Sequence, residues 1–155
     1  MTGSKKSISL GLAKSKKDIS RAFRVRYIVF TKEQGIEPKI DNDELDGLAT
    51  HVIAKQNGKI IGTMRIRVYN NRARLERLAV LKDYRGKGIG KVVTEYAVSH
   101  CKKNGLKEIT LHSQFYLMDF YKSLGFTPKG RKFIEAGIEH IEMSLKLKTS
   151  NTSKK

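Results

Sequence analysis

The sequence predicts an α/β fold in which strands and helices alternate within one domain. One observation is the pair Asn57-Gly58, a strong hairpin signal, which separates two runs of strand-forming residues. A second is the helical spacing of apolar residues that follows Ser15 and returns after Ile89. The third is size, because 155 residues with 39% hydrophobic content suffice for one domain with a sizeable core.

In the first half of the chain, weak alternation over residues 7–13 predicts a strand. Ser15 and Asp18 have the spacing of a capping box, and the helix that they begin is expected to end near Thr31. Its apolar stripe consists of Ile19, Ala22, Phe23, Tyr27 and Phe30. Three strands are then expected over residues 50–56, 59–69 and 72–81, joined by Asn57-Gly58 and Asn70-Asn71.

In the second half, a helix follows the glycines at positions 86–90 and ends at Asn104-Gly105. Its apolar face consists of Ile89, Val92, Val93, Tyr96, Ala97 and Cys101. We interpret Cys101 as a core residue because it lies on this face. The remaining elements are a short strand over 109–111, a helix over 117–124 and strands over 127–133 and 139–147.

Composition narrows the class of protein. A single cysteine excludes a disulfide framework, and four histidines without paired ligand spacing predict no metal site. The apolar run over residues 8–13 is brief and interrupted, so we expect neither a signal peptide nor a membrane span. We therefore expect the protein to be cytoplasmic. The closing residues 148–155 are expected to be a disordered, basic, polar tail behind a single domain over residues 1–147.

The charge is distributed unevenly. Of the net +17, residues 1–20 carry +4 and residues 144–155 carry another +4. The body has a cluster of arginines on two successive strands, which could serve phosphate binding, solubility or nucleic acid: Arg65, Arg67, Arg72, Arg74 and Arg77. In contrast, residues 33–46 carry six acids and one lysine, Lys39, with Lys32 directly before them. This acidic segment could bind a cation, pair with the protein's own basic side chains or form a solvated loop.

The glycine-rich turn over residues 85–91 is the most specific motif. It follows a predicted strand and opens a predicted helix, an arrangement that offers backbone N–H groups and the helix dipole to an anion such as pyrophosphate. Val92 stands where a P-loop needs Ser or Thr, which disfavours ATP and GTP. The glycine spacing departs from the dinucleotide fingerprint, and Glu108 precedes its strand core, so NAD is a weaker alternative.

At Arg85-Gly86-Lys87-Gly88-Ile89-Gly90 the chain resembles the pyrophosphate loop of the GNAT superfamily of acyl-CoA-dependent N-acyltransferases. A second segment, Phe120-Tyr121-Lys122-Ser123-Leu124-Gly125-Phe126 with Gln114 seven residues before the tyrosine, is similar to another motif of that superfamily, with Gln in place of Asn. The stretches around residues 29–36, 111–114 and 135–141 resemble the ElaA/YjcF-like branch. Together they cover most of residues 20–147.

The resemblance implies a GNAT-type mixed, mostly antiparallel sheet of about six or seven strands, with helices on both faces. It also implies acetyl-CoA as donor and direct acetyl transfer to a primary amine. The residues that it assigns to the donor are Leu78, Ala79, Val80, Arg85, Gly86, Lys87, Gly88, Ile89, Gly90, Lys91, Gln114 and Phe120. Tyr121 matches the tyrosine that protonates the departing thiolate, or else is a packing residue beside Phe120 and Phe126. For Val80, the main-chain N–H is the expected donor to the thioester carbonyl.

The general base is less well defined. Glu76 is the leading candidate because strand alternation would put it on the side of Val80, although arginines on both sides of it also fit a plain ion pair. His140 is a second candidate because histidine titrates near neutral pH. Glu33 and His112 are rivals, and a water relay could replace any of them. We expect Glu33, Gln34 and His112 to contact the acceptor.

Two other functions stay open. One is a CoA-binding regulatory module without turnover, and the other is a nucleic-acid-associated basic protein, which only the lysine-rich ends and the strand arginines support. If the acidic segment faces the acceptor, that acceptor is a cationic small molecule or a basic peptide amine. We expect no membrane partner, and a homodimer is left open.

Overall fold

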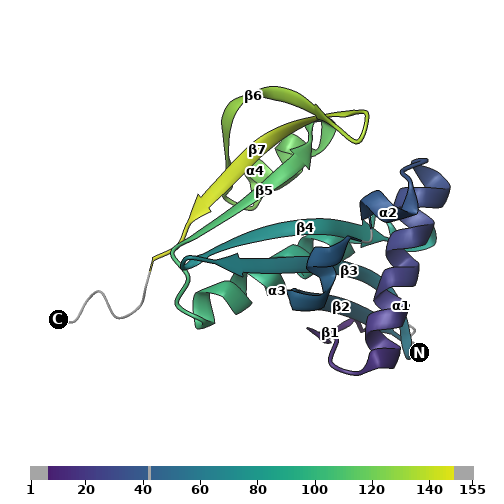
Figure 1. Cartoon of the computed structure of the whole chain (residues 1–155). Helices are drawn as coiled ribbons and strands as arrows, with labels where there is room; N and C mark the ends of the chain where they lie inside the picture. The colour runs from purple at the N-terminus through teal and green to yellow at the C-terminus, as the bar shows by residue number, and fades with distance from the viewer. Residues whose placement is uncertain (1–6, 42, 149–155) are drawn as a thin grey trace. The chain divides into compact units, whose positions relative to one another are not determined.

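The structure is a computed structural model that describes residues 7–41 and 43–148 (Figure 1). Within these residues the strands are β1 (Ser9–Leu12), β2 (Thr50–Gln56), β3 (Lys59–Tyr69), β4 (Arg72–Val80), β5 (Glu108–Gln114), β6 (Thr127–Glu135) and β7 (Ile138–Lys146). The α-helices are α1 (Lys16–Arg26), α2 (Pro38–Asp41), α3 (Ile89–Lys103) and α4 (Met118–Ser123). A π-helical segment η1 (Tyr27–Glu33) and 3-10 turns η2 (Glu44–Leu48), η3 (Lys82–Tyr84) and η4 (Phe115–Leu117) complete the order.

The strands form one mixed sheet in the order β1-β2-β3-β4-β5-β7-β6. β4 and β5 pair in parallel, whereas β1 with β2, β5 with β7 and β6 with β7 pair antiparallel. Asn57 and Gly58 both have positive φ, as do Asn70 and Asn71, which is the geometry of two-residue hairpin turns. The predicted fold class, a mostly antiparallel sheet with flanking helices, is confirmed.

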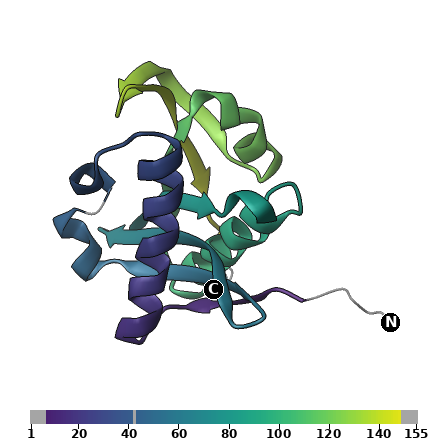
Figure 2. The ribbon, with the colours of Figure 1, turned by 90° about the vertical axis from the view of Figure 1, so that its right-hand side faces the viewer.

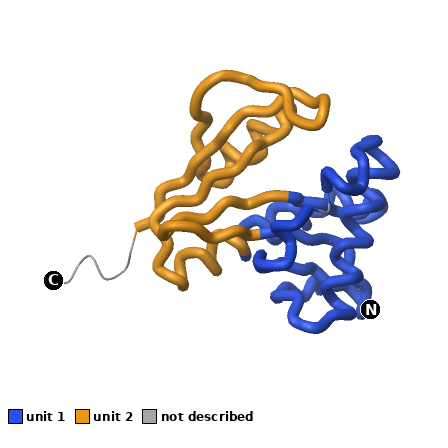
Figure 3. Tube along the Cα trace, viewed as in Figure 1, with its two compact units in different colours: residues 1–65, 77–96 blue, residues 66–76, 97–155 orange. Residues whose placement is uncertain are grey.

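The chain divides into two compact units (Figure 3). Unit 1 comprises residues 1–65 and 77–96, and unit 2 comprises residues 66–76 and 97–155.

In unit 1, α1 crosses β2 and β3 (Figure 2). The Ser15 hydroxyl accepts a hydrogen bond from the Asp18 N–H at 3.0 Å, so the predicted helix start is confirmed. Apolar side chains from α1, η1 and three strands form a core cluster of Ala22, Val25, Val29, Phe30, Ile53, Ile60 and Ala79. Burial of this apolar surface fixes the helix on the sheet.

The buried face of this helix differs from the predicted stripe. The stripe predicts a buried Tyr27, but its side chain is 39% exposed, whereas Arg26 is only 1% exposed. Arg26 is buried because carboxylates pair with it, and an apolar pattern cannot reveal such a residue. The helical stretch also continues as η1 to Glu33, two residues beyond the predicted end.

The end of α3 matches its prediction. Gly105 has φ +74°, and the Leu106 N–H donates to the Cys101 carbonyl at 3.2 Å, which is the pattern of a Schellman cap. Cys101 is fully buried, as expected of a core residue. Burial raises the pKa of its thiol to about 11.

In unit 2, β5 is longer than predicted and extends to Gln114, because it pairs along its whole length with β7. In this register His112 lies opposite Glu142, and Gln114 lies opposite His140. α4 is shorter than predicted and is followed by Gly125 at φ +99°. The core of this unit includes Ile109, Leu111, Phe126, Ile141 and Met143.

Of the predicted basic tail at 148–155, only Lys148 belongs to the described residues. Over the described ranges, no helix is both long and apolar enough to cross a membrane.

Candidate functional site

The glycine turn in unit 1 leads directly into the N-terminus of α3. Gly86 and Gly88 have φ of +78° and +82°, a region that residues with a Cβ rarely adopt. The first amide that bonds back within the helix is that of Val92, which donates to the Gly88 carbonyl at 3.1 Å. The preceding amides therefore point out of the helix end, where the helix dipole is positive.

A close packing contact positions this helix end. A Cβ added to Gly62 on β3 would lie 3.3 Å from Ile89 Cγ2 and 3.5 Å from the Ala79 carbonyl oxygen. Ile89 itself is buried at the first position of α3. Gly62 therefore lets α3 begin close against β3, a role that the sequence does not reveal.

The turn itself is open. A Cβ at Gly86 or at Gly88 would meet no atom within 4 Å. Lys87 lies with its ammonium 5.9 Å from the ring centroid of Tyr84, and Lys91 is exposed on the first turn of α3. The turn thus offers small residues, outward amides and two ammonium groups, a combination that fits a phosphate-bearing ligand.

Arg85 makes contacts within unit 1 that its motif does not predict. Its Nε donates to the Val80 carbonyl at 2.8 Å, and its Nη2 pairs with Glu33 at 2.5 Å. Gln34, the residue after Glu33, is the C-cap of η1, and its backbone N–H donates to the Thr31 carbonyl. Two residues expected at the donor and acceptor sites, Arg85 and Glu33, are therefore joined directly.

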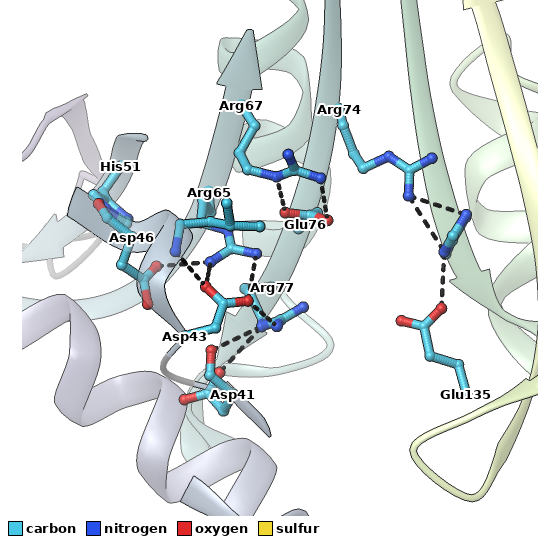
Figure 4. Close-up of polar contacts among 12 residues, drawn as sticks. Asp41, Asp43, Asp46, His51, Arg65, Arg67, Arg74, Glu76, Arg77 and Glu135 are labelled. Carbon is cyan, nitrogen blue, oxygen red and sulfur yellow. Dashed lines mark hydrogen bonds and ion pairs between the residues drawn. The ribbon is translucent and has the colours of Figure 1, made fainter. Parts of the chain in front are cut away.

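The acidic segment of unit 1 pairs with the protein's own arginines (Figure 4). Asp46 accepts from Arg26 Nη1 at 2.8 Å and from Arg65 Nη1 at 2.9 Å, and Asp43 accepts from Arg65 at 2.7 Å. Arg65, like Arg26, is 1% exposed. Of the three predicted roles for this segment, self-pairing is the one that these contacts support.

The carboxyl groups of this network titrate differently. Burial alone would raise the pKa of Asp46, but the hydrogen bonds and charges of Arg26 and Arg65 hold it below its ordinary value. Asp43 likewise has a lowered pKa, because Arg65 and Arg77 outweigh its desolvation. Burial raises the pKa of Asp41 despite its arginine partners. The arginines therefore oppose the cost of burial at all three carboxyl groups, and burial prevails only at Asp41.

Glu76, in unit 2, forms a bidentate ion pair. Arg67 Nε donates to its Oε1 at 2.8 Å, and Arg67 Nη2 donates to its Oε2 at 3.2 Å (Figure 4). The alternation that connects Glu76 with Val80 is interrupted, because Arg77 between them has φ +61°. As a base, Glu76 would have to exchange this partner for the acceptor.

Tyr121, in unit 2, lies on α4 and is 5% exposed. Its ring makes edge contacts with Phe120 at 4.9 Å and Phe126 at 6.0 Å between centroids. Burial, and to a lesser degree Tyr116, raises the pKa of its hydroxyl above the ordinary value of 10. The ring of Tyr121 can therefore pack in the core while its hydroxyl keeps a proton that it could donate.

Two histidines of unit 2 flank the ring of Phe133. His112 stands 4.9 Å from it edge-on, and His140 stacks on it at 5.9 Å. His112 Nδ1 lies 2.8 Å from Glu135, and its Nε2 accepts from Arg74 at 3.1 Å, because a guanidinium can only donate (Figure 4).

His140 is more strongly confined, at 7% exposed. Its Nδ1 lies 2.8 Å from the Ile138 carbonyl, so Nδ1 carries the proton and Nε2 of the neutral ring is an acceptor. Gln114 lies opposite it on β5. Unit 2 therefore brings together Gln114, His112 and His140, three of the predicted site residues, on adjacent strands.

Comparison with known proteins decides the family. A family model described as the acetyltransferase (GNAT) domain matches residues 20–147. The chain belongs to the GNAT acetyltransferase family. The N-acetyltransferase YjcF of Bacillus subtilis strain 168, an uncharacterized relative, is 32% identical over 133 residues, which cover 85% of this chain and 95% of YjcF.

Solved structures share the GNAT fold. Escherichia coli ElaA matches with a TM-score of 0.79 at 24% identity, covering 90% of this chain and 99% of ElaA. A GNAT acetyltransferase of Elizabethkingia anophelis, solved with acetyl-CoA bound, matches with a TM-score of 0.70 at 17% identity, covering 90% of this chain and 98% of its own. At these identities the likeness establishes the fold.

As a member of the GNAT family, the protein is an acetyltransferase whose acetyl donor is acetyl-CoA. The part of the chain with described side chains holds no group of three or more His, Cys, Asp or Glu suited to a metal ion.

The sequence did not indicate Gly62 or Arg26, and it placed Arg65 in a cluster of strand arginines without predicting its burial. Gly62 has no local signal, since only a neighbouring strand and helix make it necessary. The buried Arg26 and Arg65 are ordinary polar residues in an apolar pattern. The excess of acids in residues 33–46 of a basic chain was the one signal that could have indicated their partners.

Proposed function

We propose that this protein transfers the acetyl group of acetyl-CoA directly to a primary amine within a ternary complex. The observation that carries the proposal is the open turn at Gly86 and Gly88 before α3, in a chain of the GNAT family. The diphosphate of the donor would take hydrogen bonds from the amides of residues 88–91. Lys87 and Lys91 would add positive charge.

The rest of the donor would lie along the end of β4. The main chain of Leu78, Ala79 and Val80 would hold the pantetheine, with the Val80 N–H donating to the thioester carbonyl as negative charge develops on that oxygen. The Val80 carbonyl, which belongs to the next peptide unit, accepts a hydrogen bond from Arg85, and this contact restrains the chain directly after the Val80 N–H. Gln114 and Phe120 are the further residues proposed for the donor, because their segment resembles the second GNAT motif.

In the reaction, the amine nitrogen attacks the thioester carbon and forms the C–N bond, after which the C–S bond breaks. The amine must first lose a proton, and the leaving thiolate must gain one. Tyr121 is proposed as the donor of that second proton, since its raised pKa keeps it protonated at neutral pH.

For the first proton we propose His140, directly or through one water, ahead of Glu76 and His112. Among these three candidates only His140 has a ring acceptor, Nε2, for which no hydrogen bond is found in the described part of the chain, whereas Arg67 holds Glu76 and Arg74 donates to His112. Glu33 is a further candidate but pairs with Arg85.

The proposed acceptor is a small-molecule or peptide primary amine. The acidic segment supports a cationic acceptor only weakly, because arginines already neutralise Asp41, Asp43 and Asp46. Acceptor recognition would then depend on Glu33, Gln34 and His112.

The experiment is a thermal-shift titration with acetyl-CoA, followed by a panel of amines assayed for release of free thiol. Stabilisation by acetyl-CoA together with amine-dependent thiol release supports the proposal. Stabilisation without release from any amine favours a CoA-binding regulatory module. Absence of stabilisation overturns the proposed donor site.

A further inference from the structure

Arg77 has an unusual backbone conformation at an important place. Its φ of +61° lies in the left-handed region, although it has a long side chain and stands within β4. The residues that follow it, Leu78 to Val80, are those proposed to bind the donor through their main chain. The conformation of residue 77 therefore sets the direction of the last three residues of β4.

The side chain of Arg77 is held by the acidic segment of the same unit (Figure 4). Its Nη2 donates to the Ile40 carbonyl at 2.9 Å and to Asp43 Oδ2 at 3.2 Å, and its Nε donates to the Asp41 carbonyl at 3.1 Å. Two of these acceptors are main-chain carbonyls, so the contact depends on the path of the segment as well as on its charge.

Residues 40–46 of this segment are fixed by charge more than by apolar packing. Ile40 and Leu45 are 48% and 37% exposed, whereas the carboxylates at positions 41 and 46 are buried against Arg26. Arg65 adds a second buried anchor through Asp43 and Asp46. Arg77 is thus joined to a part of the fold that two buried arginines hold in place.

We propose that Arg77 is a positioning residue for the donor: its contacts with residues 40–43 hold the left-handed turn that presents Leu78–Val80 to the pantetheine. This inference rests on the proposed function. Without the side chain, a residue with a Cβ favours negative φ, and the strand end would lose the presented geometry. Glycine would keep it, because glycine adopts both signs of φ readily.

The test compares Arg77→Ala with Arg77→Gly by titration calorimetry with acetyl-CoA and by steady-state kinetics. We expect the alanine variant to bind acetyl-CoA about tenfold more weakly, in line with the cost of a left-handed residue. The glycine variant should stay within about threefold of the wild type. KM for acetyl-CoA should follow the dissociation constant, whereas kcat at saturating donor should change less than twofold. Arg21→Ala, which removes a half-exposed arginine of α1, is the matched control and should bind normally.

Each outcome of this comparison supports or overturns the positioning role of Arg77. Equal weakening in the two variants, or none in either, overturns the positioning role. An alanine variant that fails to fold while the glycine variant folds and binds supports it, because the two differ only by the Cβ. Failure of both variants to fold overturns it in favour of a role in stability alone. Absence of binding by the wild type would overturn the proposed function instead.

Discussion

Replacing Tyr121 by Phe removes one oxygen from a buried ring and tests its assignment as the acid. The contacts with Phe120 and Phe126, at 4.9 and 6.0 Å between centroids, involve the ring and remain. The free energy of unfolding should therefore change by about 1 kcal/mol or less. A positioned general acid contributes about 10²- to 10⁴-fold, which corresponds to about 3–5 kcal/mol of barrier. We expect kcat to fall by that factor with the affinity for CoA nearly unchanged.

The assay is thiol release at saturating acetyl-CoA and amine, with calorimetry for CoA affinity. Tyr69→Phe, which removes a hydroxyl from a more exposed tyrosine, is the matched control and should leave kcat unchanged. Because burial raises the pKa of Tyr121, this group should cause no loss of kcat below pH 10. A Tyr121→Phe enzyme with kcat within twofold of the wild type would refute the assignment.

Three further predictions concern the framework of unit 1. Arg26→Met leaves two buried carboxylates short of a partner and should lower the free energy of unfolding by about 3 kcal/mol in urea. Burial lowers the pKa of His51, so below about pH 6.5 the unfolded chain binds more protons than the folded protein. The free energy of unfolding should therefore fall as the pH is lowered below that value. His51→Gln should make this fall less steep, by at most about 1.4 kcal/mol per pH unit for one proton. Gly62→Val should press on Ile89 and weaken acetyl-CoA binding, whereas Gly47→Ala, in open space, should not.

A different result would contradict each of these three predictions. An Arg26→Met protein as stable as the wild type would mean that the ion network contributes little. If the free energy of unfolding changes between pH 7 and pH 5 by the same amount in His51→Gln as in the wild type, His51 does not cause the loss of stability in acid. Normal acetyl-CoA affinity in Gly62→Val would show that the helix start tolerates displacement.

Local signals predicted most of the fold, including the glycine turn that precedes α3. The two hairpins, the Ser15 cap and the Gly105 stop follow from turn and capping chemistry that lies within a few residues of sequence. The alternate glycines at 86 and 88 follow from the same kind of local rule. Element type was therefore correct where short-range geometry decides it.

Long-range charge pairing could not be predicted. The burial of Arg26 depends on carboxylates 15 and 20 residues away, and Glu76 pairs with Arg67 on the neighbouring strand. The left-handed Arg77 also interrupts the alternation on which the choice of Glu76 as base relied. Tertiary packing decides which acid pairs with which arginine, and the spacing of residues along one strand does not predict these pairs.

The most direct test of the donor site is titration of the wild type and Gly88→Glu with acetyl-CoA by calorimetry. At position 88 a glutamate combines an unfavourable φ with a negative charge at the helix end, so we expect saturable heat from the wild type and affinity about a hundredfold or more lower in the variant. Gly105→Glu, equally left-handed at the far end of α3, should bind as the wild type does. No saturable heat from the wild type, or equal affinity in Gly88→Glu, would contradict a diphosphate held at the start of α3.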